Sequence, residues 1–176
     1  MNAALVPEVA EARDHVRGSS GPTLLMYGDY ECPYTRMAYR SVKFLEAEGV
    51  PFRFVFRHFP LVEIHPHALA AAEASEAAAA QGRFWPMHDL LFRRQKALES
   101  ADLELYADEI GLDVERFRRE LAAHVYLDRI EADRSSALES RATGTPTIFL
   151  DGLRYLGSYE RAELRRALSP DGEENE

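Results

Sequence analysis

The segment Asp29-Tyr30-Glu31-Cys32-Pro33-Tyr34-Thr35 decides the expected fold, because it joins two elements of different periodicity. The apolar run before it, 23–28, is typical of a buried β-strand. After it, apolar residues recur every three to four positions over 33–48, which predicts an amphipathic helix. Pro33 suits the first turn of that helix, where a missing N–H group does no harm. The pattern therefore places Cys32 where a strand gives way to a helix.

This position gives the Cys32 thiol a favourable electrostatic environment. The first N–H groups of a helix have no partner within the helix, and the helix dipole is positive at this end. Both effects favour the thiolate, which is the nucleophile in cysteine chemistry. We therefore expect Cys32 to be an accessible nucleophile, and Thr35, one helical turn away, to hydrogen-bond its sulfur. The alternative is a small buried apolar residue, as free cysteines often are.

A second strand and a helical region are expected next. Residues 52–57 follow the helix stop Gly49-Val50-Pro51 and are typical of a β-strand. A strand–helix–strand unit of this length implies two parallel strands with a right-handed crossover. From 65 to 121 the pattern is helical, with Ser100 and Asp113 as predicted helix N-caps.

The C-terminal part of the chain is predicted to complete the sheet. A long helix over 124–143 precedes two short strands, 147–150 and 153–156, on either side of Asp151-Gly152, a strong hairpin signal. Ser158 is predicted to cap a final helix. The expected order of strands across the sheet is 52–57, 23–28, 147–150 and 153–156.

Composition narrows the classes of partner. The chain has 176 residues and a net charge of −9, which argues against nucleic acid and against anionic membrane surfaces. Its apolar runs are far shorter than the roughly 18 residues that a membrane span requires. There is one cysteine, so no internal disulfide framework, and the N-terminus lacks the pattern of a secretory signal. These features predict a cytoplasmic protein.

Four histidines are candidate metal ligands by residue type. Their spacing does not resemble a zinc site, so we expect no metal and expect them to cap helices or to hydrogen-bond the backbone. The candidates are His58, His65, His67 and His88.

Three segments carry motifs that belong together. They are the Cys-Pro-Tyr-Thr segment at 32–35, Phe56-Arg57-His58-Phe59-Pro60-Leu61 followed by His65-Pro66-His67, and Gly144-Thr145-Pro146-Thr147-Ile148-Phe149. In this order they resemble the active-site segment, the segment after the second strand, and the cis-proline loop of the DsbA-like thioredoxin-fold oxidoreductases. The resemblance covers residues 14–168, nearly the whole chain.

The resemblance implies a thioredoxin-like α/β fold, with a central mixed sheet and a DsbA-like α-helical insertion. We expect one structural domain in five parts: a helical or irregular lead-in at 1–22, the first half of the core at 23–60, the insertion at 61–123, the second half of the core at 124–168, and a disordered acidic tail at 169–176.

Thr35 departs from the pattern of the resembled family, whose usual motif is Cys-Pro-Tyr-Cys. In a dithiol enzyme the first cysteine attacks a disulfide and the second resolves the mixed disulfide. A threonine hydroxyl cannot attack sulfur, so the chain cannot donate an internal disulfide. What remains is monothiol chemistry at Cys32: mixed-disulfide exchange, deglutathionylation or isomerisation, each with an external resolving thiol.

The expected site follows from this chemistry and from the resemblance. Cys32 and Thr35 are the catalytic candidates, and the substrate-binding candidates are Pro33, Tyr34, Thr145 and Pro146. If Pro146 is cis, as the resemblance implies, its loop packs against Cys32 and leaves the Thr145 backbone free to pair with an extended peptide or with the cysteinyl unit of glutathione.

Protein or small-molecule thiols and disulfides are the expected partners. No cofactor is expected, although glutathione or another low-molecular-weight thiol could serve as co-substrate, and a dimer is compatible with the predicted helices. Two alternatives remain open. One is a redox-inactive thioredoxin-fold module that binds peptides or acts like a chaperone. The other is an enzyme similar to the kappa-type glutathione transferases, which share the fold but usually use a serine.

Overall fold

The computed structural model describes residues 3–169, and a five-stranded sheet forms its centre in the order β1-β3-β2-β4-β5. β2 and β3 are parallel, whereas the other three neighbouring pairs are antiparallel. The predicted thioredoxin-like mixed sheet and its four-strand order are thus confirmed. The strands are β1 (His15–Arg17), β2 (Thr23–Gly28), β3 (Arg53–His58), β4 (Thr147–Leu150) and β5 (Leu153–Tyr155).

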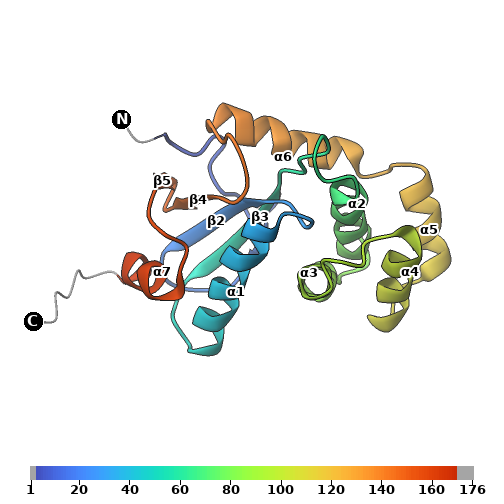
Figure 1. Cartoon of the computed structure of the whole chain (residues 1–176), viewed down its shortest axis with the longest axis horizontal. Helices are drawn as coiled ribbons and strands as arrows, with labels where there is room; N and C mark the ends of the chain where they lie inside the picture. The colour runs from blue at the N-terminus through green and yellow to red at the C-terminus, as the bar shows by residue number, and fades with distance from the viewer. Residues whose placement is uncertain (1–2, 170–176) are drawn as a thin grey trace, which may run out of the picture.

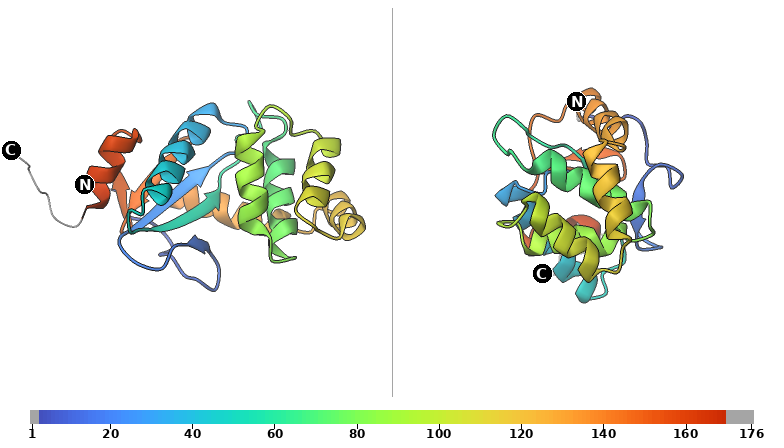
Figure 2. Two further views of the ribbon diagram at one scale, coloured as in Figure 1. Left: turned by 90° about the horizontal axis from the view of Figure 1, so that it is seen from below. Right: turned by 90° about the vertical axis from the view of Figure 1, so that its right-hand side faces the viewer.

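Helices cover both faces of this sheet. Figure 1 and Figure 2 show α1 and α7 on one face and α6 on the other. Alternation along β2 explains this arrangement, because Leu24 and Met26 pack in one apolar cluster with Val42 of α1, while Leu25 packs in a second cluster with Ala137 of α6. The helices are α1 (Pro33–Ala47), α2 (Ala68–Ala79), α3 (Phe84–Arg93), α4 (Ser100–Glu109), α5 (Val114–Ala122), α6 (Leu127–Glu139) and α7 (Arg161–Leu168).

The four helices α2 to α5 form a separate group beyond the end of the sheet toward which β2 and β3 point (Figure 2). Their apolar faces belong to the same buried cluster as one face of the sheet: Leu103 of α4 and Phe117 of α5 lie in the cluster that contains Leu24. The carboxyl end of β2, the start of α1 and this helical group therefore meet in one region, and Cys32 lies there.

β1 was not anticipated, since its residues fall in the predicted lead-in. It pairs antiparallel with β3 at the edge of the sheet. A buried ion pair fixes the chain just before it: Arg57 of β3 donates to both carboxylate oxygens of Asp14, at 2.8 and 3.0 Å. Both side chains are completely buried. A three-residue strand has too few residues to show a period in sequence.

Helix caps were predicted with mixed success. Asp113 caps α5 and accepts from the Arg116 N–H at 2.9 Å, as expected. The prediction for Ser100 is wrong, because Glu99 is the N-cap of α4 and forms a reciprocal capping box with Asp102. The prediction for Ser158 is also wrong, because α7 has Glu160 as its N-cap.

The other boundaries follow from backbone geometry. The helix predicted from 124 begins only at Leu127, because His124 has a φ of 49°, outside the right-handed helical region. The hairpin is confirmed: Asp151 and Gly152 both have positive φ, at 46° and 79°, as a two-residue turn of this type requires. Of the predicted acidic tail, 170–176 lie outside the described residues. None of the helices within 3–169 combines the length and the apolar character needed to cross a membrane.

Candidate thiol site at the start of helix α1

Cys32 is the N-cap residue of α1, and Pro33 is the first residue of the helix. The Cys32 S–H donates to the carbonyl oxygen of Thr145, with a sulfur–oxygen distance of 3.4 Å. The peptide bond between Thr145 and Pro146 is cis. Two segments that are 113 residues apart in sequence therefore meet at the sulfur.

The expectation of an accessible thiol is wrong for this conformation, because only 3% of Cys32 is exposed. The sulfur turns inward onto the Thr145 carbonyl instead of outward to solvent. The other candidates around it differ: Tyr34 is 58% exposed, Pro33 is exposed, and Thr145 and Pro146 are half-buried. The surface next to the thiol is thus open, while the thiol itself is covered.

Thr35 has a structural role that was not expected. It is completely buried, and its hydroxyl accepts the Asp29 N–H at 3.4 Å. No hydrogen bond joins it to the Cys32 sulfur within residues 3–169, so that prediction is wrong. Its methyl group packs against Gly28, where an added Cβ would lie 2.7 Å from the Thr35 methyl carbon and 2.5 Å from the Phe56 ring. Thr35 therefore fills the junction between β2 and α1.

The buried carboxylate of Asp29 organises the loop before Cys32. It accepts the backbone N–H groups of Glu31 and Leu61 at 2.7 and 2.8 Å, and it is 2.8 Å from Nδ1 of His65. A buried charge is stable only when its hydrogen bonds are made, and here three donors surround it. Asp29 thus ties the Cys32 loop to the segment that follows β3.

Glu31 makes a second tie to the same segment. Its carboxylate accepts the His67 N–H at 2.7 Å and lies 2.9 Å from His67 Nδ1. This hydrogen bond raises the pKa of His67 above its usual value, with a further contribution from nearby Glu99. The His65-Pro66-His67 motif therefore places two imidazoles against carboxylates. His67 is the N-cap residue of α2, as expected of a histidine that caps a helix, but its side chain makes no cap hydrogen bond. Within 3–169, no three His, Cys, Asp or Glu side chains are grouped to hold a metal ion.

Gln95, which follows α3, was missed by the sequence analysis. Its side-chain amide donates to the carbonyl oxygens of Tyr30 and Cys32, at 2.7 and 2.9 Å. These two bonds join the helical group directly to the backbone of the thiol loop. No local pattern could reveal them, because the partners are more than 60 residues apart.

Two buried aromatic side chains, Tyr30 and His88, support the loop that carries Cys32. The hydroxyl of Tyr30 is 2.7 Å from Nδ1 of His88 in α3. Burial raises the pKa of Tyr30 well above its usual value and lowers the pKa of His88 well below its own. Both side chains are therefore neutral near pH 7, and the pair gives the loop a rigid, uncharged support.

The sheet, the helical group and the cysteine facing a proline-bearing loop define the DsbA-like form of the thioredoxin fold. Three of the solved structures that share it illustrate the likeness. BdbD from Bacillus subtilis, in its oxidised form, has a TM-score of 0.80 and 19% identity, covering 95% of this chain and 97% of that one. A thioredoxin-like oxidoreductase from Silicibacter pomeroyi DSS-3 has a TM-score of 0.78 and 26% identity, covering 89% and 91%. The thiol-disulfide exchange protein α-DsbA2 from Wolbachia pipientis has a TM-score of 0.77 and 18% identity, covering 90% and 87%.

The chain belongs to the thioredoxin family, whose pattern it matches over residues 12–169. Curated relatives that match this chain are named as Na⁺/H⁺ antiporters. A Na⁺/H⁺ antiporter NhaA 1 from Salinispora arenicola is 45% identical over 167 residues, which is 94% of this chain but 26% of the relative. A Na⁺/H⁺ antiporter NhaA from Herminiimonas arsenicoxydans is 47% identical over 93% of this chain and 26% of its own length. The chain thus spans about a quarter of the length of these relatives.

Proposed function

We propose that the chain carries out thiol–disulfide exchange through Cys32 alone, with a thiol from another molecule completing each cycle. The observation that carries this proposal is the position of Cys32 at the start of α1, 3.4 Å from the Thr145 carbonyl beside Pro146. One helical turn away, where a resolving sulfur would be needed, stands the buried hydroxyl of Thr35. The site supplies one nucleophile and no second.

The proposed reaction balances without a further oxidant or reductant. The Cys32 thiolate attacks one sulfur of a disulfide, a new sulfur–sulfur bond forms to Cys32, and the other substrate sulfur leaves as a thiolate. A second thiolate from solution, or from the substrate itself, then attacks the mixed disulfide and releases Cys32. The net result is exchange or rearrangement of a disulfide.

The inward position of the sulfur implies a step before attack. The S–H group can donate to the Thr145 carbonyl only while it carries a proton. Ionisation removes that donor and leaves a negative sulfur beside a carbonyl oxygen, which favours rotation of the thiolate toward solvent. The substrate would then lie against Pro33 and Tyr34 and pair with the backbone at Thr145 and Pro146. The Thr145 hydroxyl, buried without a partner among the described residues, is available for that complex.

Proteins and small molecules bearing thiols or disulfides are the proposed partners. A cycle that depends on an external thiol runs best where free thiols are kept reduced, so we propose that the protein works in the cytoplasm. Glutathione or a similar thiol would serve as co-substrate.

The test is turnover of a glutathione mixed disulfide in excess glutathione, together with the intact mass of the protein during the reaction. We expect turnover and a transient increase in mass by one glutathione, both absent from Cys32→Ser. A Thr35→Ser variant is the control for the fold of the loop, because it keeps the hydroxyl that accepts from Asp29. A wild-type protein that neither accepts glutathione nor turns over would rule out the proposal.

The second candidate is a redox-inactive module that binds extended peptides at the same loop. The low exposure of Cys32 favours it. It predicts that a peptide binds equally well to the wild type and to Cys32→Ser, and that iodoacetamide modifies Cys32 no faster than an ordinary cysteine at neutral pH.

A further inference from the structure

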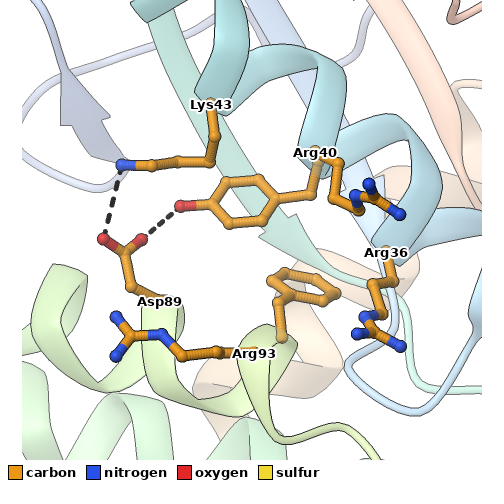
Figure 3. A pocket seen from close by; sticks show the side chains of 7 residues that line it. Arg36, Arg40, Lys43, Asp89 and Arg93 are labelled. Carbon is orange, nitrogen blue, oxygen red and sulfur yellow. Dashed lines mark hydrogen bonds and ion pairs between the residues drawn. The ribbon is translucent and has the colours of Figure 1, made fainter. Parts of the chain in front are cut away.

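Four basic side chains from two helices surround a cavity of about 280 Å³ beside the thiol site (Figure 3). The chain as a whole carries a net charge of −9. Such a concentration of positive charge on an acidic protein therefore stands out. The charged lining residues are Arg36, Arg40 and Lys43 of α1 and Arg93 and Asp89 of α3.

The single acidic residue in this cavity is already engaged. Asp89 accepts the hydroxyl of Tyr39 and forms ion pairs with Lys43 at 3.5 Å and with Arg17 at 3.2 Å. For the other three cations, the arginines, no acidic partner within ion-pair distance is found among residues 3–169. Some exposed arginines elsewhere on the surface do have an acidic partner, as Arg118 has in Glu104 at 2.8 Å, whereas for Arg119 none is found among the described residues. Arg36, Arg40 and Arg93, here called the groove arginines, thus have no acidic partner in the described part of the chain and can accept a ligand.

The cavity adjoins the backbone of the loop that carries Cys32. Arg36 lies one helical turn from Cys32, a rise of about 6 Å, and its N–H donates to the Cys32 carbonyl oxygen at 3.1 Å. Arg93 is two residues before Gln95, which binds the same carbonyl oxygen. A second cavity of about 360 Å³, lined by Arg36 and Arg93 together with Lys96, continues on this side. A group held by Arg36 would thus lie about one helical turn from Cys32.

We propose that this groove, lined by Arg36, Arg40 and Arg93, binds carboxylate groups of the disulfide substrate. The inference rests on the proposed exchange function and adds its substrate class. Guanidinium groups bind carboxylates through two parallel hydrogen bonds, a geometry that lysine does not offer. On a protein of net negative charge, this groove attracts an acidic substrate and orients it toward the thiol. The carboxylates belong either to a small disulfide such as oxidised glutathione or to an acidic peptide segment next to a cysteine.

The test compares the rates at which Cys32 reacts with three small disulfides of different charge: oxidised glutathione, neutral hydroxyethyl disulfide and cationic cystamine. At low salt, Arg40→Gln and Arg93→Gln are each expected to slow the reaction with oxidised glutathione about threefold and to leave hydroxyethyl disulfide unchanged. Added salt should remove the difference, since it screens exposed charges. Arg119→Gln, the same change at an exposed arginine of α5, is the matched control and should have no effect.

A binding measurement, which does not require Cys32 to react, distinguishes a small disulfide from an acidic peptide as the source of the carboxylates. Binding of S-methylglutathione is compared with binding of a labelled acidic peptide, each against its amide form in which the carboxylates are neutral. Tighter binding of the acidic form than of the amide form, lost in Arg40→Gln but kept in Arg119→Gln, would support carboxylate binding in the groove. The ligand that shows this preference identifies the source of the carboxylates. Equal binding of acidic and amide forms overturns the inference even if exchange is observed. If wild type reacts with none of the three disulfides, the exchange function fails, while binding still decides whether the groove takes carboxylates.

Discussion

The two sides of Cys32 carry opposite charges and differ in how those charges are satisfied. On one side, Asp29 and Glu31 are next to the cysteine in sequence, and their carboxylates receive hydrogen bonds from the backbone and from His65 and His67. On the other side, the groove arginines of α1 and α3 have no acidic partner among the described residues. The carboxylates of the acidic side are thus hydrogen-bonded within the fold, whereas the arginines of the basic side can still bind a ligand.

This difference in hydrogen bonding distinguishes residues that stabilise the site from residues that can bind a substrate. A buried carboxylate with three donors stabilises the loop and has no capacity left for a ligand. An exposed guanidinium without a partner gains more from a carboxylate brought by another molecule. Proximity to the cysteine in sequence is therefore a poor guide, since Glu31 adjoins it and is structural, whereas Arg93 is 61 residues away.

The largest effect is expected from breaking the acidic side at Asp29. Asp29→Ala leaves the N–H groups of Glu31 and Leu61 and the His65 ring without their acceptor, so we expect the free energy of unfolding to fall by about 3 kcal/mol. Urea denaturation measures it. Asp108→Asn, a change at an exposed acid of α4, is the control. A loss no larger than that of the control would show that Asp29 does not hold the loop.

A smaller loss of stability is expected from a change at Gln95, which connects the helical group to the backbone of the thiol loop. Gln95→Glu keeps the size but removes both donors to the Tyr30 and Cys32 carbonyl oxygens, and should lower the free energy of unfolding by about 1–2 kcal/mol. Because the thiol loop is then less restrained, iodoacetamide should alkylate Cys32 faster than in the wild type. Unchanged alkylation would mean that the helical group does not control access to the sulfur.

The smallest expected effect is a pH dependence of the free energy of unfolding that arises from His67. The pKa of His67 is raised in the folded protein by its hydrogen bond to Glu31, so the protonated form contributes stability below the unfolded value of about 6.5. That contribution is lost as pH rises through the raised folded pKa. Comparing wild type with His67→Gln in urea at pH values on either side of this range isolates it. The two proteins should converge in stability at the higher pH, and parallel curves would contradict the assignment.

Much of the fold could be predicted from sequence because its signals are local. The apolar run of β2, the proline at 33 and the Asp151-Gly152 turn each determine structure within a few residues. Three features could not be predicted. β1 is too short to show a period, the bonds of Gln95 join distant segments, and the burial of Cys32 depends on which way its side chain turns relative to Thr145.

The start of a helix and the likeness to a motif predict the candidate site residues, and in the structure several of them have other surroundings. Thr35 lies one turn from Cys32 as expected, yet its hydroxyl accepts the N–H of Asp29, the residue that follows β2. Tyr34 faces solvent, where a substrate can reach it. The groove arginines carried no sequence signal, since whether an acidic partner is found for them among residues 3–169 depends on where the fold places each acidic side chain.

We propose that Cys32 can start a disulfide exchange but cannot finish it without a second thiol. The direct measurement is the lifetime of a Cys32–glutathione mixed disulfide after free thiols are removed, followed by intact mass in the wild type and in Thr35→Cys. We expect the wild-type adduct to persist until an external thiol is added, whereas Thr35→Cys should release its glutathione unaided and form an internal disulfide. A wild-type adduct that disappears without added thiol, or a Cys32 that never accepts glutathione, would rule out the proposed exchange.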